Sequence, residues 1–214
     1  MKEKKIYFFF KRLIDIVLSF IGLIILFPFF IIFAVIIKCE SKGPVFFKQK
    51  RYGKNKKFFM IYKFRTMRTD APKDMPTHRL SNAESYITKF GGFMRKTSID
   101  ELPQIINILK GDMSIIGPRP ALWNQDDLME EREKYGANNI KPGLTGLAQT
   151  SGRDELEIPI KAKLDGEYVE KMSLWMDTKL FFKTILKVFK SDGVVEGKQE
   201  KEEVKDRELN EVEK

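Results

Sequence analysis

The sequence of 214 residues has few of the side chains that build disulfides and tight metal centres, with one cysteine, Cys39, and one histidine, His78. A single cysteine excludes an intramolecular disulfide, and nothing else in the chain indicates an oxidising compartment. His78 has no second histidine and no cysteine near it, which argues against a His/Cys metal site. The sequence therefore predicts a protein in a reduced, cytoplasmic setting.

Acidic residues are also in the minority, because 39 Lys and Arg outnumber 30 Asp and Glu and give a net charge of +9. Segment 196–214 holds eight acidic and five basic residues, so the rest of the chain carries +12. Such a charge indicates an anionic partner, which can be nucleic acid, an anionic membrane surface or a phosphorylated substrate. Charge alone does not choose among these three.

One long hydrophobic run is present: the 22 residues from Ile16 to Ile37 contain no charge, and that length spans a bilayer core. A signal peptide is disfavoured because the run is too long and no small-residue cleavage site follows. Five Lys or Arg precede it within residues 1–12 and five follow within 38–51, which predicts cytoplasmic placement of both ends. Pro28 predicts a kink. A helix that enters the membrane, bends and returns satisfies both observations, and a plain spanning anchor is the alternative.

The remainder of the chain predicts a mixed, mainly helical fold. Apolar segments 45–47 and 58–64 around the polar link 53–57 indicate a basic β-hairpin, and residues 69–85 indicate a loop. Helices are expected at 98–110, closed by Gly111, and at 125–135 and 175–190. The last of these has basic residues opposite bulky apolar ones, which suits either an anionic membrane surface or core packing.

These patterns divide the chain into three parts. Residues 1–40 form the membrane segment, 41–195 form a membrane-associated domain, and 196–214 form a charged tail that is expected to be disordered.

Two adjacent carboxylates, Asp100 and Glu101, open the helix expected from Ser98. Ser98 and Glu101 have the spacing of a capping box, and acids in a first helical turn complement the helix dipole, so a structural role accounts for them. Beside Arg95, in an anchored basic chain, the same carboxylates can hold Mg²⁺ at a pyrophosphate substrate. An Asp can also attack phosphorus directly.

Two stretches rich in Gly and Pro are typical of backbone that approaches a ligand closely: 117–120, and 141–146 running to Gly152 and Arg153. Ordinary surface turns explain the same residues. Arg119 and Arg153 within these stretches offer phosphate contacts.

Taken together, these residues make the chain from Lys11 to about Gly197 resemble the bacterial sugar transferase family, monotopic phosphoglycosyl transferases that begin glycan assembly on undecaprenyl phosphate. The resemblance is carried by a set of motifs in chain order: Lys63–Met67, Ser98–Gln104, Lys110–Ser114, Gly117–Pro120, Pro142–Gly146 and Gly152–Arg153.

The resemblance implies an α+β, mainly helical monotopic membrane protein with a kinked N-terminal re-entrant helix, interfacial amphipathic helices and a small β-hairpin. It places the active site on the cytoplasmic face of the bacterial inner membrane. The implied reaction moves a sugar 1-phosphate from a UDP-sugar to undecaprenyl phosphate and releases UMP, at the start of capsule, exopolysaccharide or glycoprotein glycan assembly. Membrane lipids are further implied partners, and nucleic acid is not one.

The family also implies roles for single residues. Asp100 matches the nucleophile that forms an aspartyl phosphosugar intermediate, Glu101 matches the residue associated with Mg²⁺, to which Asp100 is also assigned, and Arg95 matches the arginine five residues before the nucleophile. Four further basic residues are expected to bind substrate: Lys63, Arg65, Arg119 and Arg153.

The chain departs from the family pattern at three positions. Leu147 replaces a common tryptophan, Lys141 replaces a common arginine, and Phe27 precedes Pro28 where serine is frequent. A serine would hydrogen-bond a carbonyl freed by the kink, so with Phe27 both the re-entrant and the spanning helix remain open.

Two other functions are considered: a membrane-bound basic adaptor, in which Asp100 and Glu101 are caps, and an enzyme that transfers only the sugar and releases UDP. The residues do not identify the sugar or the oligomeric state.

Overall fold

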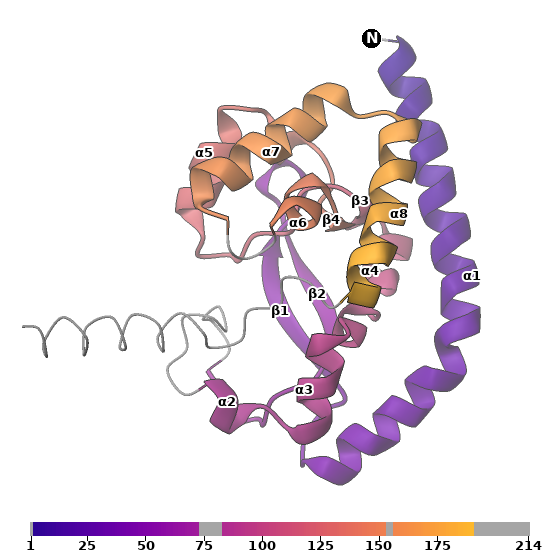
Figure 1. Cartoon of the computed structure of the whole chain (residues 1–214), viewed down its shortest axis with the longest axis vertical. Coiled ribbons are helices and arrows are strands. Elements are labelled where there is room, and N and C mark those ends of the chain that lie inside the picture. Colours follow the sequence, from indigo (N-terminus) through magenta and orange to yellow (C-terminus); the bar gives the residue numbers. More distant parts are fainter. Residues whose placement is uncertain (1, 73–82, 153–155, 191–214) are drawn as a thin grey trace, which may run out of the picture.

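The computed structural model describes residues 2–72, 83–152 and 156–190 (Figure 1). These residues are mostly helical, with one long apolar N-terminal helix and a small antiparallel hairpin, as the sequence predicts. In chain order the elements are α1 (Lys2–Glu40), β1 (Phe46–Tyr52), η1 (Lys54–Lys56), β2 (Phe58–Phe64), α2 (Ala83–Tyr86), α3 (Lys89–Lys96), η3 (Ile99–Glu101), α4 (Gln104–Lys110), β3 (Ser114–Ile116), α5 (Asp126–Glu133), η4 (Ala137–Asn139), β4 (Gly143–Thr145), α6 (Leu147–Ser151), α7 (Ile158–Lys171) and α8 (Leu174–Lys190).

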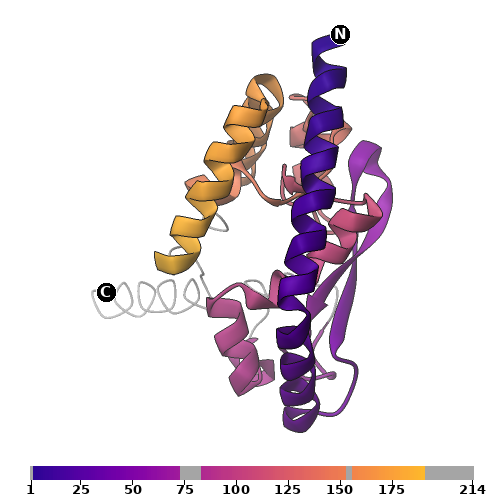
Figure 2. The same ribbon diagram turned by 90° about the vertical axis from the view of Figure 1, so that its right-hand side faces the viewer.

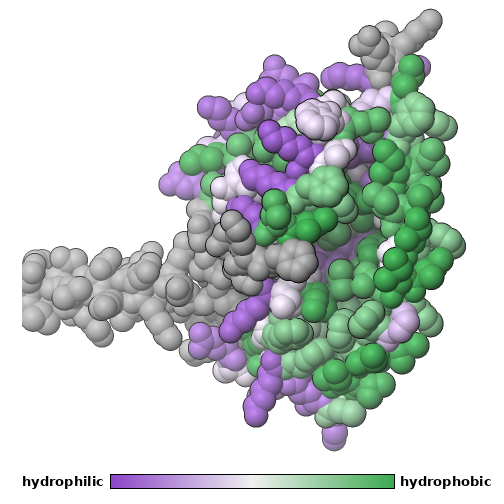
Figure 3. Space-filling model, turned by 45° about the vertical axis from the view of Figure 1, so that its right-hand side comes forward, coloured by the Kyte–Doolittle hydropathy of each residue, from purple (hydrophilic) through white to green (hydrophobic). Residues whose placement is uncertain are grey.

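Helix α1 runs along the whole body of the molecule, with α8 on one side and the hairpin on the other (Figure 2). It continues through Pro28 as one helix, and Figure 1 shows that it bends along its course. By length and composition it is long and apolar enough to cross a membrane, and only 11% of its most apolar window is buried. The space-filling view accordingly shows hydrophobic residues along this edge (Figure 3).

Both ends of α1 are fastened to the same body. Near its start, Arg12 donates hydrogen bonds of 2.6 and 2.9 Å to the carbonyls of Ile108 and Leu109 in the last turn of α4. Further along, Asp15 accepts a 2.9 Å hydrogen bond from the backbone N–H of Ile115. Near its end, Arg65, the residue that follows β2, donates to three backbone carbonyls within residues 37–42. Helix α1 is therefore an integral edge of the fold rather than a separate extension.

The hairpin pairs β1 with β2 in antiparallel register, from Phe46 opposite Phe64 to Tyr52 opposite Phe58, with η1 in the expected link. Strand β1 extends five residues beyond the predicted 45–47 segment. The second half of β1 is polar, and its buried residue is Gln49, which pairs with Ile61. The alternation of apolar residues that predicts a strand is therefore missing there. The aromatic ring of Phe64 lies 5.1 Å from that of Phe30, which joins the hairpin to α1.

A second, two-stranded parallel sheet was not predicted. Strands β3 and β4 pair Ser114 with Gly143 and Ile116 with Thr145. A Cβ atom at Gly143 would lie 2.1 Å from the backbone nitrogen of Gly117, so this contact needs glycine. These glycines bring two chain segments together, a role that neither the ligand interpretation nor the surface-turn interpretation predicted.

The helix expected at 98–110 is divided into the short turn η3 and helix α4, whereas α5 and α8 lie close to the predicted ranges. Gly111 ends α4 with φ of 90°, as predicted. The capping box is wrong, because Ser98 has a left-handed φ of 56° and its side chain makes no capping hydrogen bond. The tail 196–214, the loop residue His78 and Arg153 lie outside the described residues, and the division into three parts stays a prediction.

Candidate active site

The two carboxylates of η3 lie side by side in the chain and face different surroundings. Asp100 and Glu101 are 8% and 9% exposed. In a 3₁₀ turn successive residues are separated by about 120°, so neighbours cannot share one direction. Asp100 lines a basic cavity beside the hairpin, and Glu101 lines a mainly apolar cavity beside α8.

Glu101 is held by two cations from distant parts of the chain. Lys63 of β2 places its Nζ 2.7 Å from Glu101 Oε1, and Arg119 places Nη2 2.8 Å from the same oxygen. Burial alone would raise the pKa of Glu101, but the charges and hydrogen bonds of Arg119 and Lys63 hold it well below its usual range. Glu101 is therefore the ionised partner that keeps the two cations in place.

Asp100 is less strongly paired. Its Oδ2 is 3.6 Å from Lys63 Nζ, beyond the usual length of a hydrogen bond. Burial raises the pKa of Asp100; Lys63 and Arg95 oppose the rise, and the charge of Glu101 adds to it. A buried carboxylate that is partly desolvated and aimed into a cavity is suited to nucleophilic attack once it is ionised.

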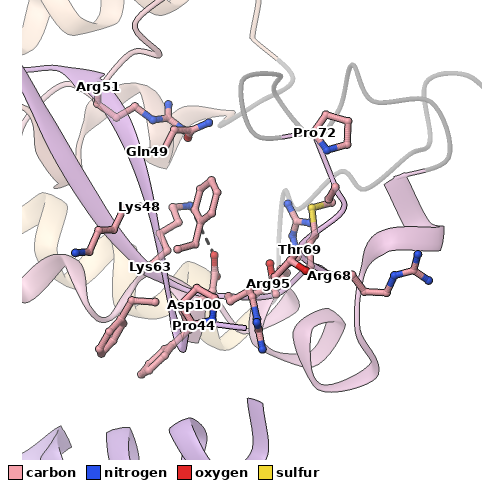
Figure 4. Close-up of a pocket in the computed structure, with 17 residues that line it drawn as sticks. Pro44, Lys48, Gln49, Arg51, Lys63, Arg68, Thr69, Pro72, Arg95 and Asp100 are labelled. Atoms are coloured by element: carbon pink, nitrogen blue, oxygen red, sulfur yellow. Dashed lines mark hydrogen bonds and ion pairs between the residues drawn. The ribbon is translucent and has the colours of Figure 1, made fainter. Parts of the chain in front are cut away.

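The cavity on the Asp100 side has a volume of about 470 Å³, within the range of small-molecule sites. Among the described lining residues Asp100 is the sole carboxylate, and six are basic: Lys48, Arg51, Lys63, Arg65, Arg68 and Arg95. In Figure 4, Lys63 reaches toward Asp100 at one end of the cavity, and Gln49 and Arg51 line the other end. This lining suits a ligand that carries several negative charges.

Arg119 reaches Glu101 because the β3–β4 region is packed backbone against backbone. A Cβ at Gly146 would lie 2.2 Å from the carbonyl oxygen of Gly117, and one at Gly117 would lie 2.7 Å from the carbonyl oxygen of Lys141. These contacts fix the segment after β3 over η3. The Gly-Pro motif thus positions Arg119 through the fold.

The structure brings together most of the residues selected from the sequence. Lys63, Arg95 and Arg119 lie around the carboxylate pair. Arg65 shares the wall of the basic cavity, but it is 5% exposed and its guanidinium donates to carbonyls in the last turn of α1 and just after it. Gln49 and Arg51 of the cavity were missed. A strand continued past Phe47 would have placed them beside Lys63.

Magnesium fits this site only as an ion shared with a substrate. Among the described residues no cluster of three or more His, Cys, Asp or Glu exists that could enclose a metal. Asp100 and Glu101 together offer carboxylate oxygens, and Mg²⁺ is typically bound by one or two carboxylates completed by substrate phosphates and water. The donor set is therefore compatible with that arrangement and not with an all-protein cage.

Comparison with known proteins adds independent information. Residues 6–191 match the family model described as bacterial sugar transferase. The chain is 40% identical over 186 residues to the UDP-glucose:undecaprenyl-phosphate glucose-1-phosphate transferase of Escherichia coli K12, covering 84% of this chain and 40% of that protein. It is 41% identical over 185 residues to a Bacillus subtilis protein named uncharacterized sugar transferase EpsL, covering 86% of this chain and 89% of that protein.

A Rhizobium leguminosarum exopolysaccharide production protein is 40% identical over 186 residues, covering 82% of this chain and 93% of that protein. The chain thus spans about 40% of the length of its longer relatives and most of the length of its shorter ones. The family match covers Asp100, Glu101 and all but the first residues of α1, so this chain belongs to the bacterial sugar transferase family.

Proposed function

We propose that this protein transfers a sugar 1-phosphate from a UDP-sugar to undecaprenyl phosphate and releases UMP, at the start of capsule, exopolysaccharide or glycoprotein glycan assembly. The observation that carries the proposal is Asp100, a weakly paired carboxylate with a raised pKa at the wall of a strongly basic cavity. Names of relatives supply the substrate class, since the E. coli protein is a UDP-glucose:undecaprenyl-phosphate transferase.

The basic cavity is the proposed site for the UDP-sugar. Lys63 and Arg95 beside Asp100 offset the negative charge of the diphosphate, and Arg51 lies farther along the same wall. Arginine adds a planar pair of donors that matches phosphate oxygens. The cavity thereby orients the diphosphate with one phosphorus atom at Asp100.

The chemistry proceeds in two displacements at one phosphorus atom. An Asp100 oxygen attacks the phosphorus that bears the sugar, an O–P bond forms, and the bond to UMP breaks as UMP leaves with the electron pair. A phosphate oxygen of undecaprenyl phosphate then attacks the same phosphorus, and the Asp100 carboxylate leaves. Glu101, held by Lys63 and Arg119, keeps both cations beside the reacting group.

Asp100 and Glu101 are the residues that would hold Mg²⁺ together with the substrate phosphates. When bound, the ion would supply additional neutralisation of phosphate charge.

We also propose that the protein is monotopic and lies at the cytoplasmic face of the bacterial inner membrane. Helix α1, with 39 residues, is about 58 Å long at 1.5 Å per residue, whereas a bilayer core is about 30 Å thick. Because Arg12 and Arg65 fasten both parts of α1 to one body, a straight crossing would draw that polar body into the lipid. The bend in α1 and its attachments support a re-entrant placement (Figure 1).

The transfer is tested by mixing stoichiometric enzyme with a UDP-sugar and Mg²⁺ but no acceptor. Up to one equivalent of UMP should appear, and the mass of the protein should rise by one phosphosugar. A panel of UDP-sugars in the same assay identifies the sugar. Release of UDP would instead support a transferase that moves only the sugar. If no nucleotide product appears with any donor and acceptor, the alternative of a membrane-bound basic adaptor protein would be supported.

The topology is tested by cysteine labelling in a Cys39→Ser background. A cysteine introduced at the N-terminus should resist a membrane-impermeant reagent in intact cells and react after the cells are opened. Reaction in intact cells would contradict the re-entrant placement.

A further inference from the structure

A smaller cavity lies near Gly111, at the end of α4 that is remote from the carboxylate turn η3. Its volume is about 170 Å³, and its walls come from α1, η1, β3 and α7, with residues 140–141 and Met172. Neither Asp100 nor Glu101 lines it, so it is separate from the two cavities of the candidate active site. It is also smaller than most sites for drug-sized ligands, which begin at about 300 Å³. A second nucleotide-sugar site is therefore not expected here.

Cations outnumber carboxylates in this lining. Its charged residues are Lys11, Arg12, Asp15, Lys54 and Lys141. Lys11 is already paired, because its Nζ lies 2.7 Å from a carboxylate oxygen of Asp177 on α8. The charges that remain for a ligand are those of Arg12, Lys54 and Lys141, opposed by a single carboxylate within the lining. The cavity therefore favours an anion.

Arg12 and Lys141 converge over the end of α4. A Cβ atom placed at Gly111 would lie 3.5 Å from Arg12 Nη2 and 3.5 Å from Lys141 Nζ, so both cations reach the same point. Arg12 donates to the carbonyls of Ile108 and Leu109, and a guanidinium has more N–H donors than these two bonds use. No described residue forms a hydrogen bond or ion pair with the Lys141 ammonium. Partial burial and the charge of Arg12 lower the pKa of Lys141, and an anion between the two cations would relieve their repulsion.

Apolar side chains adjoin these cations. Phe8 lines the cavity and is 40% exposed, and Ile140 and Met172 add to the apolar part of the lining. Phe9 and Phe10 extend the exposed apolar surface at the start of α1. Figure 1 shows the connection from α7 to α8 beside the same turns of α1. In the proposed membrane placement these turns lie at the boundary between cytoplasm and lipid, where a ligand can have both a charged group and apolar chains.

We infer that this cavity binds the phosphate group of an anionic membrane phospholipid. Arg12, Lys54 and Lys141 contact the phosphate oxygens, and the acyl chains leave past Phe8 along the exposed face of α1. A free phosphate ion shares the chemistry of the headgroup, but only a lipid uses the adjoining apolar surface. The excess of cations disfavours a headgroup that carries its own ammonium group. The bound lipid ties the start of α1 and the end of α4 to the membrane surface, a role that goes beyond the transfer reaction and uses the proposed membrane placement.

Lipid binding to the full-length protein in a neutral detergent tests the inference. Native mass spectrometry should show one retained phosphatidylglycerol, and this lipid should raise the unfolding temperature more than phosphatidylcholine does. Lys141→Gln should weaken phosphatidylglycerol binding about fivefold or more, and Lys141→Arg should retain it, because the charge beside the phosphate is lost in the first variant only. Lys54→Gln changes an exposed residue that should not disturb folding, and it should weaken binding similarly. Lys163→Gln, at an exposed position of α7 outside the cavity, is the matched control and should bind normally.

Three outcomes would overturn the inference. Equal binding of phosphatidylcholine, or an equal loss in Lys163→Gln, would indicate only a general attraction between lipid and protein surface. Stabilisation by inorganic phosphate as strong as that by phosphatidylglycerol at the same concentration would assign the cavity to a free ion. A raised KM for undecaprenyl phosphate in Lys141→Gln, measured without phosphatidylglycerol, would assign it to the transfer reaction, whereas a separate cavity predicts an unchanged KM and UMP burst. Selective lipid binding by a protein that transfers no phosphosugar would contradict the proposed function alone.

Discussion

The two cavities beside η3 differ in chemistry although the residues that face them are neighbours in the chain. Six basic residues line the Asp100 side, whereas the Glu101 side has a mainly apolar surface and three charged residues in its lining. One 3₁₀ turn separates them, because it directs consecutive side chains apart. A single short turn therefore separates a basic cavity from a mainly apolar one.

The same division appears in the electrostatics of the pair. Burial raises the pKa of Asp100, whereas Arg119 and Lys63 outweigh burial and lower the pKa of Glu101. The fold supplies cations to Glu101 at 2.7 and 2.8 Å and leaves Asp100 at 3.6 Å from Lys63. Two carboxylates with opposite shifts are expected where one reacts and the other organises charge.

The largest effect is expected from Asp100→Asn. Loss of the attacking oxygen should lower turnover by at least about 10³-fold and abolish both the UMP burst and the phosphosugar adduct. Stability should stay equal or rise slightly, because the raised pKa means that the fold disfavours the charged form of Asp100 at neutral pH. Single-turnover assays, intact-protein mass and thermal unfolding measure these three results. Near-normal turnover would show that Asp100 is not the nucleophile.

A smaller loss, about 10²-fold in turnover, is expected from Glu101→Gln, since Lys63 and Arg119 lose the charge that positions them. The apparent Mg²⁺ affinity should fall in the same variant, without unfolding, and EDTA should abolish the activity of the unmodified protein reversibly. Glu167→Gln removes an exposed carboxylate paired with Lys171 and serves as the control with unchanged kinetics. Full activity in EDTA would remove Mg²⁺ from the proposed function.

Arg95→Lys is expected to cost about tenfold or more in turnover, because lysine keeps the charge and loses the planar pair of donors. The loss should appear in the acceptor-free burst rate, since Arg95 lines the cavity of Asp100 and not that of Glu101. Stopped-flow or quench measurements of UMP release with and without undecaprenyl phosphate test this. A defect seen only in the acceptor-dependent step would contradict the assignment of Arg95 to the step that releases UMP.

The smallest effect is a shift in pH dependence. Asp100 must be ionised to attack, and burial raises its pKa above the ordinary value of an aspartate. The burst rate should therefore fall on acidification at a higher pH than for an ordinary aspartate. Lys63→Met removes a charge that opposes the rise, so the acidic limb should move to still higher pH. If the burst rate falls at the same pH in both proteins, Lys63 does not affect the pKa of Asp100.

Local patterns in the sequence were sufficient for the elements with strong periodicity or long apolar runs. Helix α1, strand β2, helices α5 and α8 and the cap at Gly111 follow from hydrophobic spacing and from single residues with restricted backbone preference. The motif around Asp100 and Glu101 was also visible, and its match to the family was enough to select the carboxylates.

Local sequence patterns could not predict the roles of residues that depend on contacts with distant chain segments. Arg65 was expected to bind substrate, and packing turns its guanidinium toward the carbonyls that end α1. The sequence around Gly117 and Gly143 was compatible with a ligand contact or with ordinary turns, and the structure shows that the two glycines approach each other. Gln149, a buried residue of α6 whose side-chain amide has no hydrogen-bond partner among the described residues, carried no local signal in the sequence.

The sequence by itself determined the long apolar edge, the basic character of the folded part and the identity of the two carboxylates, because these depend on composition and local order. Only the tertiary structure decided which carboxylate is held closely by two cations and which is paired only weakly. That division requires Lys63 and Arg119, 38 residues before and 18 residues after Glu101, to meet at one oxygen. The meeting is produced by strand pairing and glycine contacts between segments far apart in the chain, which no local pattern encodes.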